Sequence, residues 1–481
     1  MIRIRNLIDG EWQESAAERW QDVHNPATGE LLAQTPFATS TEVDAAIAVA
    51  HTAFEEWRRT PPMARARILF RFKSLLEENF EELARQVTLE NGKVLDDARG
   101  EVRRAIENVE TAAGIPSLML GTMAEDISEG IDEETIRQPL GVCTMFAPFN
   151  FPAMVPMWFV PFALAAGNTF VLKPSERTPL TQTRMAGLLL DAGLPEGVYN
   201  VVHGGADVAR QLAEDPLVRA VSFVGSTPVA RQVYVTAATA GKRVQCQGGA
   251  KNMLVVMPDA DIRRTVPTIL ASAFGNAGQR CLAGSGILAV GDIYDPLVDA
   301  LVEQAAALRV GNGLDERTQV GPVISPQAKA RILGYIERGL AQGAHLLLDG
   351  REIPAASGAG NFIGPTIFDE VTPEMEIARD EIFGPVLSIL RVPSLDAAIS
   401  VIEGSRYGNM ACIFTGSGRA AREFKYRVPA GNIGINVGVA APIAFFPFGG
   451  MKDSFFGDLH GQGQDAVDFF THKKVVITRW F

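Results

Sequence analysis

Ala220-Val-Ser-Phe-Val-Gly-Ser-Thr-Pro-Val-Ala230 is a short apolar run that leads directly into a helical pattern, Val229–Ala238. Short apolar runs bounded by turn residues are typical of buried strands. The same alternation continues on both sides of this stretch. Further strands are expected at Val142–Ala147, Thr169–Leu172, Tyr199–Val202 and Leu254–Met257, and further helices at Thr178–Ala192 and Val208–Ala213. Strands that alternate with helices predict βαβ units and a parallel, doubly wound sheet.

A second α/β region follows Asp259, where a helix over Ile262–Phe274, a strand near Gly286–Val290 and a helix over Pro296–Leu308 are expected. At 481 residues the chain is too long for one hydrophobic core, so two or three domains are predicted. The N-terminal third is predicted to be rich in helices. Ser40 or Thr41 is expected to cap the first one, and two further helices are expected over Met63–Val87 and Val94–Ala113.

Two further segments are predicted to project from these domains. Ala124–Gln138 alternates polar and apolar residues and contains Gly130, as an exposed hairpin would, and Lys474–Trp480 has the alternation of another strand. Exposed strand edges need partners, so the chain is expected to form oligomers.

Composition limits the class of protein. A net charge of −12 argues against a general nucleic-acid binder, and four scattered cysteines suggest neither disulfides nor a zinc site, so a reducing cytoplasm fits. No signal peptide is recognised at the N-terminus.

Residues 138–172 lack charge over a length that could span a bilayer. Prolines at 148, 152, 156 and 161 argue instead for buried strands, a turn and a core helix.

Gly278-Gln-Arg-Cys281 contains the candidate nucleophile. Arg280 is a cation next to Cys281, where it can favour the thiolate or hold an anionic substrate beside the sulfur. The alternative is a small buried cysteine in a loop, because free cysteines are among the most buried residues.

Other polar residues follow predicted strands, where doubly wound sheets bind ligands. Gly225 and Ser226 stand at a helix start and can present backbone N–H groups to a phosphate, although a simple helix cap would look the same. Lys173-Pro-Ser-Glu176 follows another strand; its glutamate can bind ribose hydroxyls and would repel a 2′-phosphate. Asn150 offers an amide suited to an oxyanion. Glu381-Ile-Phe-Gly-Pro385 places a carboxylate before a turn.

Taken together, these motifs resemble the aldehyde dehydrogenase family from end to end, in order and in spacing. The resemblance implies an α/β fold with two doubly wound Rossmann-like domains and a small β oligomerisation domain. The implied NAD-binding domain covers residues 1–119 and 140–246, the catalytic domain 247–457, and the oligomerisation domain 120–139 and 458–481. The resemblance also implies a role for each site residue: Cys281 is the nucleophile, Asn150 its oxyanion donor, Lys173 and Glu176 ligands of the adenosine ribose, Glu381 the ligand of the nicotinamide ribose, and Phe149, Arg177, Gly225, Ser226 and Phe383 further cofactor contacts.

One departure from the family pattern is informative. Most members carry Glu-Leu-Gly-Gly-Lys, whose glutamate activates water, whereas this chain has Gln247-Gly-Gly-Ala-Lys251. A glutamine takes no proton near neutral pH, and an alignment shifted by one residue would place Cys246 there, which is no carboxylate either. An acyl-enzyme without activated water needs another acceptor, and coenzyme A fits because its thiol is more acidic than water.

The chain is similar in detail to the CoA-acylating methylmalonate/malonate-semialdehyde dehydrogenase group, as in Ser454-Phe-Phe-Gly-Asp-Leu-His460. This similarity implies that Arg280 and Arg104 hold the substrate carboxylate, although a solvated helix face is the alternative for Arg104. Met253 and Leu282 depart from the group pattern and are expected near the pocket.

The expected activity is oxidation of a small carboxylate-bearing semialdehyde with NAD and CoA, through a Cys281 thioester and with loss of CO₂. The expected enzyme is cytoplasmic, without a metal, and a homodimer or homotetramer. A hydrolysing aldehyde dehydrogenase that releases a free acid is the nearest alternative, and an inactive scaffold of the same fold is a more distant one.

Overall fold

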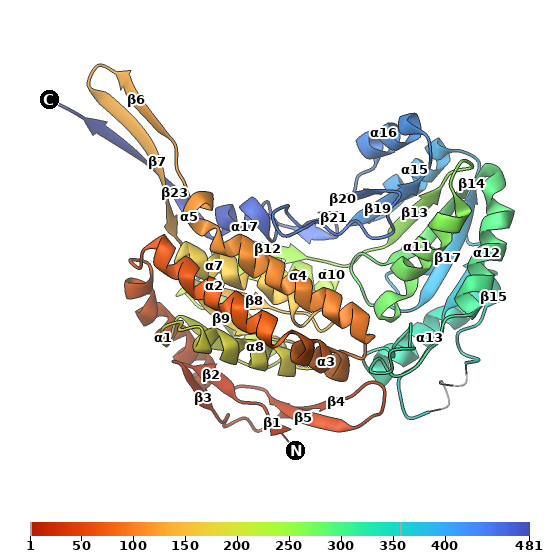
Figure 1. Ribbon diagram of the computed structural model, residues 1–481, viewed down its shortest axis with the longest axis horizontal. Coiled ribbons are helices and arrows are strands. Elements are labelled where there is room, and N and C mark those ends of the chain that lie inside the picture. Colours follow the sequence, from red (N-terminus) through yellow and green to blue (C-terminus); the bar gives the residue numbers. More distant parts are fainter. Residues whose placement is uncertain (1, 354, 356–357) are drawn as a thin grey trace.

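The computed structural model describes residues 2–353, 355 and 358–481, which form two lobes and a projecting arm (Figure 1). The first lobe is built on an eight-stranded sheet with the order β22-β12-β11-β8-β9-β10-β2-β3. Its five inner strands are parallel, and β2, β3 and β22 are antiparallel to their neighbours. In chain order the strands are β2 (Asn6–Ile8), β3 (Glu11–Gln13), β8 (Val142–Phe146), β9 (Thr169–Lys173), β10 (Tyr199–Val201), β11 (Val218–Val224), β12 (Arg243–Gln247) and β22 (Phe455–Phe456).

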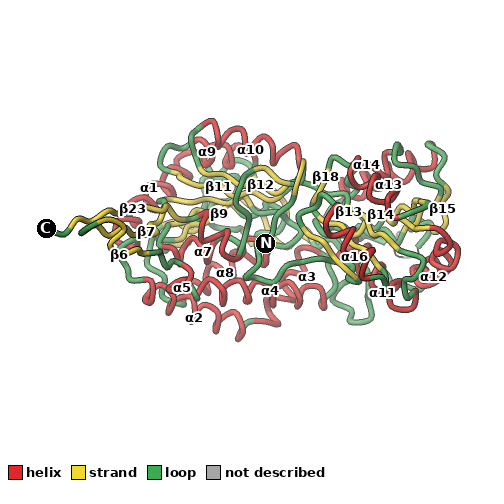
Figure 2. Tube along the Cα trace, turned by 90° about the horizontal axis from the view of Figure 1, so that it is seen from above, coloured by secondary structure: helices red, strands yellow, loops and turns green. Residues whose placement is uncertain are grey.

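Helices cover both faces of this sheet (Figure 2). One face carries α1 (Ser40–Trp57), α9 (Ala206–Glu214) and α10 (Thr227–Thr239), which share a core with β8 and β11. The opposite face carries α2 (Pro62–Glu78), α3 (Phe80–Asn91), α4 (Leu95–Ala113), α5 (Ile115–Leu118), α6 (Met154–Met157), α7 (Val160–Ala166) and α8 (Leu180–Asp191). The chain reverses its direction of winding beside β8, so the carboxyl ends of β8 and β11 border a crevice of the kind in which such sheets bind ligands.

The second lobe has a seven-stranded sheet with the order β15-β16-β17-β14-β13-β19-β20, parallel except for β15. Its strands are β13 (Asn252–Val256), β14 (Gly284–Val290), β15 (His345–Leu348), β16 (Thr366–Asp369), β17 (Val386–Val392), β19 (Met410–Phe414) and β20 (Asn432–Ile435). Its helices are α11 (Ile262–Phe274), α12 (Tyr294–Ala306), α13 (Pro326–Ala341), α14 (Glu376–Arg379), α15 (Leu395–Gly404) and α16 (Gly418–Arg427), with a short 3₁₀ turn, η2, at Gly291–Ile293.

The arm is a three-stranded sheet of β6 (Met123–Ser128), β7 (Ile131–Pro139) and β23 (Thr471–Arg479), preceded by α17 (Gly463–Phe469). Because β23 pairs with β7 along its whole length, two segments more than 330 positions apart in the sequence meet in one sheet. Two smaller sheets complete the fold: β1 (Ile2–Arg3), β4 (Trp20–His24) and β5 (Leu31–Pro36) form one, and β18 (Tyr407–Gly408) and β21 (Met451–Lys452) form the other.

The predicted α/β fold with two doubly wound sheets is confirmed. The five strands expected around residues 142–257 are all present, but β12 was not predicted, since Arg243, Gln245 and Gln247 interrupt its apolar pattern. The functional boundaries of the three domains remain a prediction.

Several local expectations were wrong. The helix expected over 63–87 is two helices, α2 and α3, which meet at Asn79. α1 is capped by Thr39, whose hydroxyl accepts from the N–H of Glu42 and whose own N–H donates to the Glu42 carboxylate, so the cap lies one residue before Ser40. The two projecting segments were expected separately, but β23 pairs with β7, so they form one sheet whose open edges are β6 and β23.

Among the described residues, no helix is long and apolar enough to cross a membrane. The uncharged segment 138–172 includes β8, α6 and α7, and it leads into β9.

Candidate active site

Cys281 lies between the two lobes, directly before β14. After α11 the chain makes a tight 3₁₀ turn, η1 (Gly275–Gly278), in which Asn276 and Ala277 both have φ of 50°. Such left-handed backbone is rare for residues other than glycine and often marks functional segments. Gly278 is required here, because a Cβ on it would lie 2.2 Å from the carbonyl oxygen of Gly384. This turn places Cys281 on the wall of a cavity of about 250 Å³.

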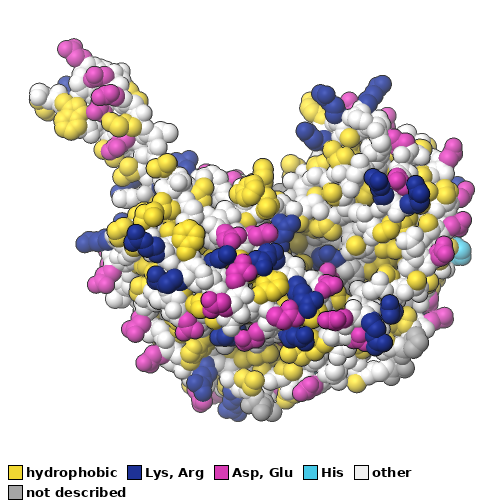
Figure 3. All heavy atoms as spheres, viewed as in Figure 1, with side chains coloured by type: hydrophobic (Ala, Val, Ile, Leu, Met, Phe, Trp, Pro, Cys, Tyr) yellow, Lys and Arg dark blue, Asp and Glu magenta, His cyan; other side chains and the backbone are white. Residues whose placement is uncertain are grey.

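The cavity is bounded by α4, by the segment around Cys281 and by residues 439–448. Apolar side chains form much of its wall, among them Phe151, Met154, Trp158 and Leu282. Arg104 and Arg280 also line it, so the wall that carries the thiol includes two arginine residues. On the surface outside, acidic and basic side chains are interspersed along the front helices (Figure 3).

The surroundings of Cys281 correct one expectation. Burial, with the charge of Glu381 added to it, raises the pKa of Cys281 to about 12, although Arg280 and the nearby backbone N–H groups act in the opposite direction. The guanidinium of Arg280 turns away to the end of α11, where Nε donates to the carbonyl oxygen of Gly275 (3.0 Å) and Nη2 to that of Ala271 (2.6 Å). Arg280 therefore does not produce a thiolate in this state of the protein, because the cost of burying the anion outweighs its charge.

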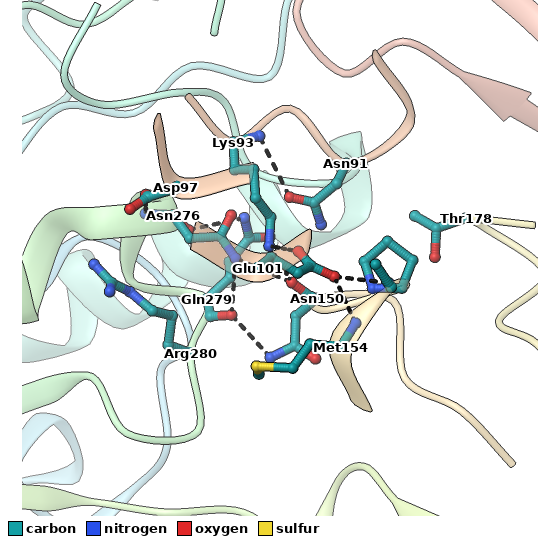
Figure 4. A network of polar contacts seen from close by, with 12 residues as sticks. Asn91, Lys93, Asp97, Glu101, Asn150, Met154, Thr178, Asn276, Gln279 and Arg280 are labelled. Carbon is teal, nitrogen blue, oxygen red and sulfur yellow. Dashed lines mark hydrogen bonds and ion pairs between the residues drawn. The ribbon is translucent and has the colours of Figure 1, made fainter. Parts of the chain in front are cut away.

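Asn150 lies beside the nucleophile segment (Figure 4). Its side-chain Nδ2 donates to the carbonyl oxygen of Gln279, two residues before Cys281, at 3.0 Å. An amide has two N–H groups, so one remains for a developing oxyanion after this bond is made. The fold thus brings together the nucleophile and the predicted oxyanion donor, which are 131 positions apart in the sequence.

Adjacent residues of α4 face different surroundings. Arg104 lines the cavity, where Nη1 donates to the carbonyl oxygen of Pro442 (3.4 Å) and lies 3.6 Å from Glu107 Oε2. Arg103 points away and forms a bidentate pair with Glu77. The alternative interpretation of Arg104 as a residue of a purely solvated helix face does not agree with these contacts.

The predicted cofactor residues lie at strand ends of the two main sheets. Lys173 ends β9; burial lowers the pKa of its ammonium group, which donates to Gly204 O (2.6 Å) and lies 3.4 Å from Glu176 Oε2. Arg177 is bound to Ser325 Oγ at 2.8 Å. Gly225 donates its N–H to the carbonyl oxygen of Gln247 (3.0 Å). Ser226 is the N-cap residue of α10, and its side chain makes no capping bond.

Glu381 faces the same region from the second lobe. Its Oε1 accepts from the N–H of Ala250 (2.9 Å), and burial raises the pKa of its carboxyl group to about 7. A Cβ on Gly249 would lie 2.4 Å from Oε2, so only glycine fits beside this carboxylate. Phe383, with φ of 54°, meets Phe149 edge to face at 5.9 Å, which joins the second lobe to the end of β8.

The position of the missing base is also defined. Gln247 ends β12, and its Nε2 donates to the carbonyl oxygen of Phe448 (3.0 Å), a residue of the cavity wall. Cys246 belongs to the core shared with α1 and α10 on the other face of the sheet. Successive strand residues point to opposite faces, so of the two alignments the one that places Gln247 at the catalytic position fits the geometry.

Some expectations about the pocket were incomplete. Leu282 lines the cavity as expected, but Met253 was wrongly placed there: it lies in β13 against a separate hollow near Arg379 and Arg406. Four polar residues that surround Asn150 were not predicted: Lys93, Glu101, Asn276 and Gln279. Glu101 stands in the same Gly-Glu-Val-Arg-Arg segment as Arg104, so the motif itself contained a signal. Within the described part of the chain, no group of three or more His, Cys, Asp or Glu side chains could hold a metal ion.

Comparison with known proteins places these features in context. Residues 12–476 match the pattern of the aldehyde dehydrogenase family. Malonate-semialdehyde dehydrogenase 2 of Geobacillus thermodenitrificans (strain NG80-2) is 54% identical over 476 residues, covering 99% of both chains. The crystal structure of methylmalonate-semialdehyde dehydrogenase from Oceanimonas doudoroffii has a TM-score of 0.98 at 46% identity, covering 100% of this chain and 99% of that one. A protein assigned as a methylmalonate-semialdehyde dehydrogenase from Sinorhizobium meliloti 1021, crystallised with NAD, has a TM-score of 0.98 at 42% identity and covers 100% and 98%.

Proposed function

The chain belongs to the aldehyde dehydrogenase family, and from this premise we propose that it is an NAD-dependent, CoA-acylating dehydrogenase of a small semialdehyde that carries a carboxylate. Its substrate is malonate or methylmalonate semialdehyde, the aldehydes named for its relatives. The observation that carries the proposal is the cavity in which a thiol shares the wall with two arginines, while the position of the usual base is a glutamine.

The cavity suits such a substrate in size and charge. A volume of about 250 Å³ accommodates a molecule of a few carbon atoms, and apolar side chains such as Phe151, Met154 and Trp158 form part of the wall. Arg104 and Arg280 hold the carboxylate, since guanidinium groups bind carboxylates in fixed, often bidentate geometry. Arg280 does so by turning from the carbonyl oxygens of Gly275 and Ala271 toward the cavity. The aldehyde carbon is thereby held at Cys281, which converts a bimolecular encounter into an oriented one.

The acylation begins when Cys281 Sγ attacks the aldehyde carbon. The thiol gives its proton to solvent water, a C–S bond forms, and the carbonyl π electrons move to the oxygen. The remaining N–H of Asn150 and the backbone N–H of Cys281 stabilise that oxyanion. NAD, when bound, supplies the acceptor for the hydride that leaves this carbon, so Cys281 becomes a thioester.

The residues at the strand ends suit a dinucleotide without a 2′-phosphate. Lys173 and Glu176 bind the adenosine ribose, and the Glu176 carboxylate disfavours a 2′-phosphate. Glu381 binds the nicotinamide ribose from the opposite lobe. Phe149, Arg177, Gly225, Ser226 and Phe383 complete the cofactor site.

Coenzyme A takes the acyl group because this site lacks a base for water. The amide of Gln247 is held by the Phe448 carbonyl and accepts no proton near neutral pH. The CoA thiolate attacks the thioester carbon and Cys281 leaves as the thiolate. Loss of the β-carboxylate as CO₂ yields acetyl-CoA or propionyl-CoA. Overall, one semialdehyde anion, NAD⁺ and CoA give acyl-CoA, NADH and CO₂, with atoms and charge balanced.

The arm is proposed to join copies of the chain. Large apolar side chains are exposed along it, including Met123, Val475, Ile477 and Trp480 (Figure 3). Exposed apolar side chains of this kind are typical of an interface, and a homodimer or homotetramer follows. Residues 120–139 and 458–481 then form the oligomerisation domain, 1–119 and 140–246 the NAD-binding domain, and 247–457 the catalytic domain.

A panel of small aldehydes with and without a terminal carboxylate, assayed for NADH with and without CoA, tests the proposal. We expect sustained turnover only with the carboxylate-bearing aldehydes and CoA, and acyl-CoA and CO₂ as products. Sustained NADH formation that CoA does not accelerate would identify a hydrolysing enzyme instead. A lack of NADH with every aldehyde, together with no NAD binding, would indicate an inactive scaffold.

A further inference from the structure

A fully buried ion pair lies behind the cavity wall. Lys93 Nζ is 2.6 Å from Glu101 Oε2, and both side chains are 0% exposed. Lys93 precedes α4 and Glu101 lies in its second turn, so the pair ties the segment before α4 to the helix itself. Both residues also line the cavity that holds Cys281.

Stability alone gives a weak reason for such a pair. Two charges lose their hydration on burial, and apolar side chains of similar volume often stabilise a core as well or better. Burial also lowers the pKa of Lys93, which shows that the charged form is disfavoured by its surroundings. The other contacts of the pair therefore indicate what it does.

Those contacts are concentrated on one short segment. Lys93 Nζ donates to the main-chain carbonyl oxygen of Asn150 (2.7 Å) and lies 4.0 Å from the ring centroid of Phe151. Glu101 Oε1 accepts from the N–H groups of Ala153 (2.7 Å) and Met154 (3.2 Å). Two side chains thus hold residues 150–154 from both ends (Figure 4).

The same segment is fixed from the nucleophile side. Asn276 Nδ2 is 3.3 Å from the carbonyl oxygen of Asn150 and 3.3 Å from that of Gln279. The Asn150 side chain donates to Gln279 in turn. The main chain of Asn150 is therefore anchored to Lys93 and Asn276, while its side chain spans the gap to the residue two positions before Cys281.

We propose that Lys93 and Glu101 are positioning residues for the oxyanion site: they hold the Asn150 main chain so that its side-chain amide points one N–H at the oxygen that becomes negative on Cys281 attack. This inference rests on the oxyanion role proposed for Asn150. Lys93 acts through the Asn150 carbonyl, and Glu101 acts by fixing Lys93 and the 153–154 N–H groups. A shift of the amide by about 1 Å is enough to slow acylation substantially.

The test removes both charges together, so that neither is left buried alone. In Lys93→Met/Glu101→Gln the glutamine oxygen can still accept from Ala153 and Met154, while the donor to Asn150 is lost. The matched control is Arg103→Met/Glu77→Gln, which removes a half-exposed pair between α4 and α2 that lies away from the cavity. We expect the burst of NADH to slow at least about 10-fold in the first variant, with KM for the semialdehyde, NAD binding and Tm close to the parent. The control keeps the parental burst rate.

A double-mutant cycle with Asn150→Ala separates positioning from other effects. If the pair acts through Asn150, its removal has little further effect in the Asn150→Ala background. Equal slowing in both backgrounds, or a parental burst rate in the first variant, would overturn the inference. If Asn150→Ala itself reacts at the parental rate, the proposed role of Asn150 is wrong, which is a separate failure. Should the methionine variant not fold, Lys93→Leu/Glu101→Gln also removes both charges and the donor to Asn150, and the same cycle with it gives the same decision.

Discussion

Arg103 and Arg104 are adjacent on α4, yet one side chain pairs with Glu77 and the other lines the cavity. We expect Arg104→Ala to raise KM for a carboxylate-bearing aldehyde by about 10- to 100-fold, because a charge-assisted contact of roughly 1.5–3 kcal/mol is lost. An aldehyde without a carboxylate should be affected far less. Steady-state kinetics on both aldehydes checks this, with Arg103→Ala as control. Equal losses on both aldehydes would argue against carboxylate binding.

The raised pKa of Cys281 has a direct consequence for its reactivity. In the protein without NAD or aldehyde, the thiolate fraction stays small up to pH 9, since the pKa is about 12. The rate of alkylation should therefore increase about tenfold per pH unit between pH 7 and 9, without a plateau. Glu381→Gln removes a charge that raises this pKa and should accelerate alkylation at each pH. Quenched time courses of labelling with iodoacetamide measure the alkylation rate of the parent and of Glu381→Gln at each pH, with Cys281→Ala as the blank. A plateau of the parental rate near pH 8 would contradict the expectation.

Gln247 determines which acceptor takes the acyl group. A glutamate at this position loses the donor to Phe448 and places a carboxylate where the family base stands. Without CoA, the parent is expected to give a burst of NADH followed by very slow turnover. We expect Gln247→Glu to raise the steady-state rate after the burst on the order of 10-fold, because a general base activates water. Gln247→Ala is the control and should show no gain. The same gain in both variants would mean that the side-chain amide only blocks water.

At the scale of elements, α8 depends on a buried carboxylate rather than on a cap of its own. Glu90, near the end of α3, accepts from the N–H groups of Leu180 (2.7 Å) and Thr181 (3.0 Å), and burial raises its pKa from 4.5 to about 7. The folded protein thus holds this proton more tightly than the unfolded chain. The stability that the proton contributes is present below pH 4.5 and is lost as the pH rises through about 7.

Glu90→Gln is neutral at every pH and isolates this effect. The Tm of the variant minus that of the parent should increase by a few degrees, roughly 2–5 °C, between pH 5.5 and 8.5. Differential scanning fluorimetry across this range measures the difference. Glu78→Gln, at an exposed position on α2, should show no such trend. A difference that is constant with pH would mean that the carboxylate stays ionised throughout.

Elements that follow local patterns were predictable, and those that depend on distant partners were not. β8, β9 and β11 are largely apolar runs, and Asn150, Lys173 and Gly225 stand at or shortly after their carboxyl ends, so both strand and site residue were visible in the sequence. β12 carries an arginine and two glutamines; Arg243 and Gln247 bond to carbonyl groups more than 200 positions away in the chain. Lys93 and Glu101 are of types normally exposed, and only the packing of α4 on residues 150–154 buries them. The pKa of Cys281 likewise depends on burial that no local pattern encodes.

At the scale of the whole molecule, the arm is predicted to decide the oligomeric state. Val475 and Ile477 are 60% and 65% exposed on one face of β23. Val475→Lys/Ile477→Lys should lower the molar mass in solution, because two charges cannot be buried in an apolar interface without partners. Light scattering after gel filtration measures the mass. Tyr426→Lys, on an exposed residue of α16, should leave it unchanged; an unaltered mass in the double variant would place the interface elsewhere.

The last part of the chain supplies one strand to each main sheet and one to the arm. β20 lies in the sheet of the second lobe, β22 lies beside β12 in the first, and β23 pairs with β7 in the arm. During synthesis the second sheet can be completed once β20 has been made, whereas the first sheet and the arm stay incomplete until residues 455–479 leave the ribosome. Until then the outer edge of β12 is an open strand, and β7 waits for a partner more than 330 positions away. Open edges invite pairing with other chains. The nascent protein is thus most prone to aggregation late in translation, and premature termination a few dozen codons from the end should leave an insoluble product although both lobes are almost entirely made.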